Sequence, residues 1–302
     1  MNTLIEPANQ QVMLSRLLSS LRAGECILFL GAGVHTAPPD GSVFQYPKDR
    51  RPLLGRELAE TLARECEYQK KFPDDKSPDL QRITLCYENT RGMGRMALVD
   101  ALVRHLRISK TPSPALEMLA ALPVKIFVTT NYDDLLERAL RKLDKDPAVY
   151  VYDPKGDELT DDMAEPPMPE HPLLFKMHGD LGHPNSIVIT DEDYISFVQR
   201  MSDARYNHHP LPETVRFHLA KWPTLFIGYS LHDYNFRLVF RTLRWGIDKA
   251  KTPAAYSVDP QPDPLIVIVW ENQKQLVTFL VQDLWSFLPW LYREVMGKDY
   301  TA

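Results

Sequence analysis

Four short apolar segments of this sequence end in turns rich in glycine or asparagine, and this arrangement constrains the fold more than any other feature. The segments are residues 26–30, 124–129, 173–180 and 224–228. Strands that end in tight turns and lead into helices are typical of a parallel sheet with helices on both faces. We therefore predict an α/β, Rossmann-like fold, in which a ligand binds at the carboxyl ends of the strands.

The sequence between the first two of these segments has a different pattern. Residues 55–110 carry apolar residues at helical spacing, as in GRELAETLARECEY. We therefore predict one domain over residues 1–302, in which a helical module interrupts the α/β pattern. The predicted parts are a Rossmann-like core over 1–50 and 111–270, a helical insertion over 51–110, and a C-terminal helix over 271–302.

Further elements are expected in the second half of the chain. Residues 186–190 form a brief β-branched run, and residues 191–199 begin a helix with an acidic cap. A helix is expected from about Asn235. The run LIVIVW at 265–270 indicates another buried strand. Residues 273–296 indicate a final helix whose apolar surface either packs on the domain or serves in assembly.

Composition limits the classes of partner and location. Hydrophobic residues make up 44% of the 302 residues and charged residues 25%, so a buried core is expected. The formal net charge of −5 argues against a broad nucleic-acid-binding surface, and we predict no direct nucleic-acid binding. Cys26, Cys66 and Cys86 form no CxxC pair, so neither a zinc site nor a disulfide framework is indicated. With no apolar run long enough to span a membrane, a cytoplasmic location is expected.

The first turn, Gly31-Ala32-Gly33, has two interpretations. A backbone without Cβ atoms lets a pyrophosphate approach closely, and the N-terminus of a following helix offers free N–H groups. A tight bend between strand and helix explains two glycines equally well. Because position 36 is Thr36 and no GK[ST] follows, an ordinary dehydrogenase and a P-loop NTPase are both disfavoured.

The second turn, TTNYD at 129–133, is also open to two interpretations. Asn131 and Asp133 are separated by one residue and could simply cap the next helix. An asparagine amide at a sheet edge can instead bind a ribose hydroxyl and hold a water molecule, because it both donates and accepts hydrogen bonds.

The remaining turns contain His178-Gly179 and Gly228-Tyr229-Ser230. A histidine at the edge of a sheet is a candidate proton acceptor near neutral pH. A metal-ligand role is the alternative, but no HxH or HExxH spacing supports it, and we predict no metal. Ser230 could bind a phosphate or a ribose, or cap a helix. Since GYS is not a GxSxG elbow, a serine nucleophile is disfavoured.

In this order and context, the four turns resemble those of the sirtuin (Sir2) family, and most closely its bacterial Sir2-like branch associated with antiphage defence. That family has Gly-Ala-Gly after the first strand, a T-[QT]-N-x-D segment, a strand ending in His-Gly, and a late Gly-x-Ser. The matching segments are GAG at 31–33, TTNYD at 129–133, HG at 178–179 and GYS at 228–230. The resemblance extends over about residues 20–245.

Two departures separate this chain from the deacylases of the family. The chain lacks the two CxxC pairs that hold a structural zinc in those enzymes. It also has His35 where deacylases have a serine, and no D-F-R segment follows. The resemblance therefore implies NAD+ chemistry without the module that helps to frame an acyl-lysine cleft.

The resemblance implies an NAD+ hydrolase that cleaves the nicotinamide–ribose bond and depletes NAD+ in antiphage defence. It implies Asn131 and His178 as catalytic residues. The implied NAD+-binding residues are Gly31, Ala32, Gly33, Thr130, Asn131, Asp133, Gly228 and Ser230. Control by homo-oligomerisation or by a separate sensor or activator, such as a nucleic-acid-guided or ATPase partner, is expected. A sirtuin-type deacylase or ADP-ribosyltransferase is the alternative enzyme, and a non-catalytic NAD+ or ADP-ribose sensor is the alternative binding protein.

Overall fold

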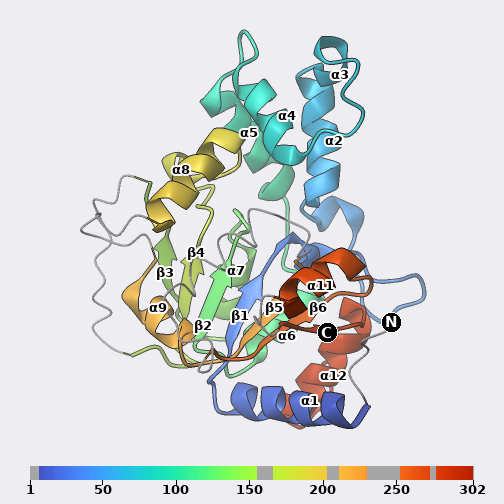
Figure 1. The fold of residues 1–302 in the computed structure, drawn as a ribbon, viewed down its shortest axis with the longest axis vertical. Helices are drawn as coiled ribbons and strands as arrows, with labels where there is room; N and C mark the ends of the chain where they lie inside the picture. Colours follow the sequence, from blue (N-terminus) through green and yellow to red (C-terminus); the bar gives the residue numbers. More distant parts are fainter. Residues whose placement is uncertain (1–6, 155–165, 203–210, 230–251, 273–276, 302) are drawn as a thin grey trace.

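Parallel β-strands form the centre of the molecule in the computed structural model (Figure 1). The structure describes residues 7–154, 166–202, 211–229, 252–272 and 277–301. Among these residues, seven parallel strands form one sheet in the order β3-β4-β2-β1-β5-β6-β7. The strands are β1 (Ile27–Leu30), β2 (Ile126–Thr129), β3 (Ala148–Val151), β4 (Leu173–Lys176), β5 (Thr224–Ile227), β6 (Ala255–Val258) and β7 (Val277–Leu280).

Helices cover both faces of the sheet, which confirms the predicted fold class. One face packs against α1 (Pro7–Arg22), α6 (Pro114–Ala121), α7 (Leu135–Arg141) and α12 (Leu284–Met296). The other face packs against α8 (Asp191–Ser202), α9 (Glu213–Leu219) and α11 (Pro264–Asn272). Within β1, Leu28 and Leu30 belong to the first core, and Ile27 and Phe29 to the second. Burial on both faces explains why these strands are continuous apolar runs rather than alternating ones.

A layer of helices occupies the chain between β1 and β2 and lies at the top of Figure 1. These helices are α2 (Gly55–Glu65), α3 (Tyr68–Lys71), α4 (Leu80–Glu88) and α5 (Arg95–Leu106). Their core includes Leu62 and Leu102, together with Ile187 and Ile189 from the segment after β4. The β-branched run at 186–190 joins no strand of the sheet and packs against the helical layer instead.

The prediction of a strand at 265–270 is wrong, because this segment belongs to the helix α11. A run of six apolar residues does not by itself distinguish a strand from a buried helix. Ile266 and Trp270 lie four positions apart and are buried, whereas Leu265 and Ile268 are exposed. The Asp263 carboxylate accepts a hydrogen bond from the N–H of Ile266 at 3.0 Å and caps the first turn of this helix.

The final helix is shorter than predicted. Its expected first half contains β7, which pairs with β6 at the edge of the sheet. The helix α12 begins at Leu284, where the Asp283 carboxylate accepts hydrogen bonds from the N–H groups of Trp285 and Ser286. That cap stops the helix from extending back toward β7. The helix expected from about Asn235 lies outside the described residues.

The turns after β1 and β5 pack backbone against backbone. The N–H of Gly31 donates to the carbonyl of Ile227 at 3.0 Å, and the N–H of Gly33 donates to the carbonyl of Gly228 at 2.9 Å. A Cβ atom at Gly31 would lie 2.5 Å from the Gly228 oxygen, and one at Gly33 would lie 2.7 Å from the Gly228 Cα. Both glycines of the first turn are therefore required by this contact. The helix expected after them is only a single 3-10 turn, η1 (Ala32–His35).

We expect Gly228→Ala to destabilise the protein more than Gly297→Ala, which is its matched control. Both glycines have positive φ angles, +72° and +71°. An alanine in that conformation costs about 1–2 kcal/mol. Only a Cβ at Gly228 would also collide with backbone, and overpacking of this kind adds about 1–3 kcal/mol. Urea unfolding followed by circular dichroism measures both losses; equal losses would show that the backbone contact relaxes freely.

Candidate active site

The four turns singled out in the sequence lie side by side at one edge of the sheet. They follow β4, β2, β1 and β5, which are consecutive neighbours in the strand order (Figure 1). Because all these strands are parallel and in register, their carboxyl ends face the same way. This edge is where α/β sheets bind ligands.

Asn131 joins the turn after β2 to the turn after β1. Its side-chain amide donates to the Gly31 carbonyl at 3.3 Å, and its backbone N–H donates to the Thr129 hydroxyl at 3.0 Å. The side chain is half-buried, so part of it stays accessible. The structure thus brings Asn131 directly to the paired-glycine turn.

Tyr229 and Thr130 form a second link across this edge. The Tyr229 hydroxyl donates to the Thr130 hydroxyl at 2.8 Å and so connects the turn after β5 to the turn after β2. Tyr229 was not singled out from the sequence, where it stood only as the middle residue of Gly-Tyr-Ser. Ser230, which was singled out, lies outside the described residues.

His178 comes to the same edge from β4 and is almost fully buried. Its ring makes edge-to-face contacts with Tyr194 and Phe197 of α8, and the Tyr194 hydroxyl lies 3.4 Å from its Nδ1 atom. Burial lowers the pKa of His178 to about 3, so the imidazole is neutral around physiological pH. A neutral imidazole has one nitrogen with a free lone pair, which can accept a hydrogen bond or a proton, and one N–H group that can donate.

Asp133 is buried beneath the turn after β2, and both of its carboxylate oxygens have partners. Oδ1 accepts a hydrogen bond from the N–H of Leu135 at 2.9 Å, at the start of α7. Oδ2 lies 3.4 Å from the Nε2 atom of His35 in η1. Burial opposes ionisation of this carboxyl group, but His35 and Lys176 outweigh it and hold the pKa of Asp133 below its ordinary value. Asp133 therefore binds the first N–H of α7 and pairs with His35, although the N-cap position of that helix is Asp134.

Lys176, the last residue of β4, is fully buried and connects three segments. Its ammonium group donates to the carbonyl of Asp133, to Oε1 of Glu137 at 2.9 Å, and to the carboxylate of Asp180. Burial opposes its charge, but Glu137, Asp180 and Asp133 outweigh that effect and raise the pKa of Lys176. Lys176 was not predicted as a site residue. Its position at the end of an otherwise apolar strand is the feature of the sequence that could have indicated it.

In the part of the chain that the structure describes, no group of three or more histidine, cysteine, aspartate or glutamate side chains is placed to hold a metal ion. No helix in those ranges is both long and apolar enough to cross a bilayer. The three cysteines are free thiols.

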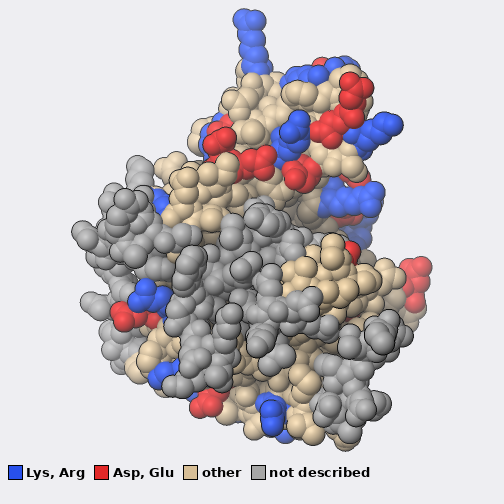
Figure 2. All heavy atoms as spheres, in the orientation of Figure 1, with Lys and Arg blue, Asp and Glu red and all other residues tan. Residues whose placement is uncertain are grey.

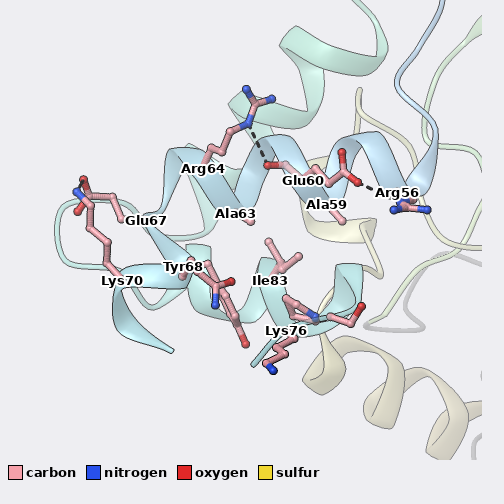
Figure 3. A pocket seen from close by; sticks show the side chains of 13 residues that line it. Arg56, Ala59, Glu60, Ala63, Arg64, Glu67, Tyr68, Lys70, Lys76 and Ile83 are labelled. Atoms are coloured by element: carbon pink, nitrogen blue, oxygen red, sulfur yellow. Dashed lines mark hydrogen bonds and ion pairs between the residues drawn. The ribbon is translucent and has the colours of Figure 1, made fainter. Parts of the chain in front are cut away.

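A separate hollow of about 990 Å³ lies on the helical layer (Figure 3). Ala59, Ala63 and Ile83 line it together with charged side chains, among them Arg56 and Glu60, which form an ion pair at 3.0 Å. Lys, Arg, Asp and Glu side chains intermingle over this part of the surface (Figure 2). None of the residues that line the hollow belongs to the four turns.

Comparison with known proteins gives a family match and several distant relatives. A family model described as a SIR2-like domain matches residues 125–279, about half of the chain. The NAD(+) hydrolase ThsA of Enterococcus faecium is 28% identical over 249 residues, which cover 81% of this chain and 45% of that protein. The protein of the same name from Acinetobacter baumannii (strain 532279) is 26% identical over 235 residues, 78% of this chain and 42% of that protein.

A third relative is the defense-associated sirtuin 2 of Bacillus subtilis. It is 25% identical over 265 residues, which cover 86% of this chain and 23% of that protein. The chain therefore spans less than half the length of these curated relatives.

We expect Lys176→Met to lower the free energy of unfolding by about 3–5 kcal/mol, because it leaves the buried carboxylate of Glu137 and the partly buried carboxylate of Asp180 without their cation. Lys142→Met is the matched control, since Lys142 pairs with Glu117 at 2.7 Å on the surface and is 66% exposed. Its loss should stay within about 1 kcal/mol. Urea unfolding of both variants gives the comparison, and similar losses would mean that Lys176 contributes no more than a surface pair.

The burial of His178 should make folding stability depend on pH. The folded protein keeps this imidazole neutral down to about pH 3. The unfolded chain binds a proton near the ordinary pKa of about 6.5. The contribution of the neutral His178 to the free energy of unfolding is therefore complete above about pH 6.5. It falls by about 1.4 kcal/mol for each pH unit below that value.

Urea unfolding between about pH 7 and pH 5 tests this dependence. His178→Phe keeps the aromatic packing against Tyr194 and Phe197 and should have a smaller loss of stability over this range than the wild type. His171→Phe, at an exposed position before β4, should leave the slope unchanged. If the free energy of unfolding changes with pH equally in the wild type and in His178→Phe, the assignment of a neutral buried imidazole is contradicted.

Proposed function

The chain belongs to the SIR2-like domain family, and from this premise we propose that it is an NAD+ hydrolase. The observation that carries the proposal is the placement of Asn131 and the neutral imidazole of His178 at the sheet edge that holds the paired-glycine turn. The names of the relatives from Enterococcus faecium and Acinetobacter baumannii support the same activity.

In this proposal the turns around the edge bind NAD+. The accessible part of the Asn131 amide orients the ribose and a water molecule, since an amide both donates and accepts hydrogen bonds. His178 is the proton acceptor. The remaining proposed NAD+-binding residues are Gly31, Ala32, Gly33, Thr130, Asp133, Gly228 and Ser230.

The reaction needs a base but no strong acid. When the bond between the ribose C1′ atom and the nicotinamide nitrogen breaks, its electron pair returns to the cationic ring, and nicotinamide leaves as a neutral molecule. A water molecule then adds to C1′ and gives its proton to His178. The products are nicotinamide, ADP-ribose and one proton. In this proposal the neutral imidazole of His178 takes up that proton.

The biological setting is part of the same proposal. The name of the Bacillus subtilis relative supports a role in defence, in which an activated enzyme depletes the NAD+ of an infected cell. Free hydrolysis would harm the cell, so we propose control by self-association or by a separate sensor or activator. The three free thiols support a reducing, cytoplasmic location.

Incubation of the purified chain with NAD+, followed by chromatography of nicotinamide and ADP-ribose, tests the activity. His178→Ala should lower turnover at least about 100-fold, because a placed base contributes about 10²–10⁴. Asn131→Ala should lower it about 100-fold, because a substrate that is no longer oriented reacts about 100-fold more slowly. His171→Ala is the control, since His171 is exposed at the opposite end of the same strand. It should keep the wild-type rate.

Two further arms of this experiment separate the alternatives. Addition of an acetylated peptide should not be required for NAD+ loss; product that forms only with the peptide would identify a deacylase. Turnover per chain should rise with protein concentration if self-association activates the enzyme. His178→Ala with wild-type turnover would refute the proposed mechanism.

A further inference from the structure

His35 is a buried histidine to which the proposed reaction gives no role. It belongs to η1, directly after the paired-glycine turn, and only 2% of it is exposed. Its Nε2 atom lies 3.4 Å from Oδ2 of Asp133. Neither ring nitrogen makes a hydrogen bond with any residue that the structure describes. Burial of an imidazole without hydrogen bonds is costly, so this position is not explained by packing alone.

The contact between His35 and Asp133 has a counterpart between the same two segments. Asn131, two residues before Asp133, donates its side-chain amide to the carbonyl of Gly31, four residues before His35. The turn after β1 and the turn after β2 are therefore joined by these two side-chain contacts, in addition to the hydrogen bonds that the Thr130 N–H and the Thr129 hydroxyl donate to the carbonyl of Leu30. If the contact between His35 and Asp133 is lost, the Asn131 side chain keeps its hydrogen bond of 3.3 Å to Gly31, but the turn that carries Asn131 loses its contact with η1.

The Asp133 side chain is well suited to transmit the effect of His35. Its Oδ1 atom is held by the N–H of Leu135 at the start of α7, so the contact with His35 sets the remaining direction of the carboxylate. The carbonyl of the same residue accepts from Lys176 in β4. Asp133 is thus connected to three elements that surround the proposed NAD+ site.

We propose that His35 is a positioning residue of the proposed NAD+ site, which acts through Asp133 to hold Asn131 against the paired-glycine turn. This inference rests on the proposed function, because it assigns to Asn131 the orientation of the ribose and water. His35 itself touches none of the reacting atoms. A displacement of about 1 Å in a group that orients a substrate can lower the rate about 100-fold.

Several charged or titratable groups around Asp133 set the pH dependence. Lys176 and Glu137 lie on the side of β4 and α7, and Asp180 shares the Lys176 ammonium group. Burial raises the pKa of the Tyr46 hydroxyl, the negative charge of Asp133 raises it further, and Arg51 opposes this shift. Removal of His35 leaves Lys176 as the main cation that favours ionised Asp133, so the pKa of Asp133 should rise.

Kinetics of the full chain provide the first test. His35→Ala should lower kcat about 10- to 100-fold and change KM little, because the glycine turns and Thr130 stay in place while Asn131 loses its support. His35→Gln keeps an N–H donor near the position of Nε2 and should recover most of kcat at neutral pH. It removes the electrostatic contribution of His35 that lowers the pKa of Asp133, so the acid limb of its pH–kcat profile should move to higher pH.

The matched control is His105→Gln in the helical layer. His105 forms the same kind of pair, with Nε2 at 2.9 Å from Oε1 of Glu65, but outside the four turns. Its kcat and pH profile should equal those of the wild type. A His35→Ala variant with wild-type kcat and an unchanged pH profile would overturn the inference. So would a loss of kcat that follows a loss of thermal stability and is not recovered in His35→Gln.

Nuclear magnetic resonance provides a second test that does not depend on turnover. The side-chain amide signals of Asn131, assigned with Asn131→Ala, should shift in His35→Ala and stay unchanged in His105→Gln. The carboxyl carbon of Asp133, assigned with Asp133→Asn, should titrate at higher pH in His35→Gln. Unchanged signals overturn the positioning role. If the signals shift in His35→Ala but the wild-type chain does not cleave NAD+, the proposed function is refuted and the contact between the turns is still established.

Discussion

The buried ammonium group of Lys176 is the interaction on which the arrangement of the candidate site depends. A charge without water must be balanced by neighbouring groups, and here these come from the turn after β2, from α7, and from the segment after His178. Because one cation must satisfy all of them, their relative positions are not independent. The two turns that carry the proposed catalytic residues are therefore held on a common support, although they are far apart in the sequence.

A different kind of contact holds the other half of the edge. Gly31 and Gly33 approach Gly228 so closely that no side chain fits between the turns after β1 and β5. The Asn131 amide then connects this pair of turns to the half supported by Lys176. Contacts within the protein thus hold this edge together. Fixed donors and acceptors of this kind stabilise a transition state without reorganisation during the reaction.

Local patterns predicted the sheet with helices on both faces, the four turns and the helices of the layer above. They failed where a local pattern is ambiguous. Residues 265–270 are apolar throughout, and only their packing distinguishes a helix from a strand. Residues 277–280 were predicted as helix because their place at the edge of the sheet, beside β6, depends on pairing with a distant strand. The short strands β3 and β6 were missed for the same reason.

The sequence by itself determined the class of fold and the positions of the candidate turns, because strand length, apolar patterning and turn chemistry are properties of neighbouring residues. Only the tertiary structure decided which turns meet, since the order β4-β2-β1-β5 comes from pairing across long stretches of chain. It also gave His35 its partner Asp133 and Lys176 its carboxylates. A buried polar group must find its partner in space, and no local pattern specifies that partner.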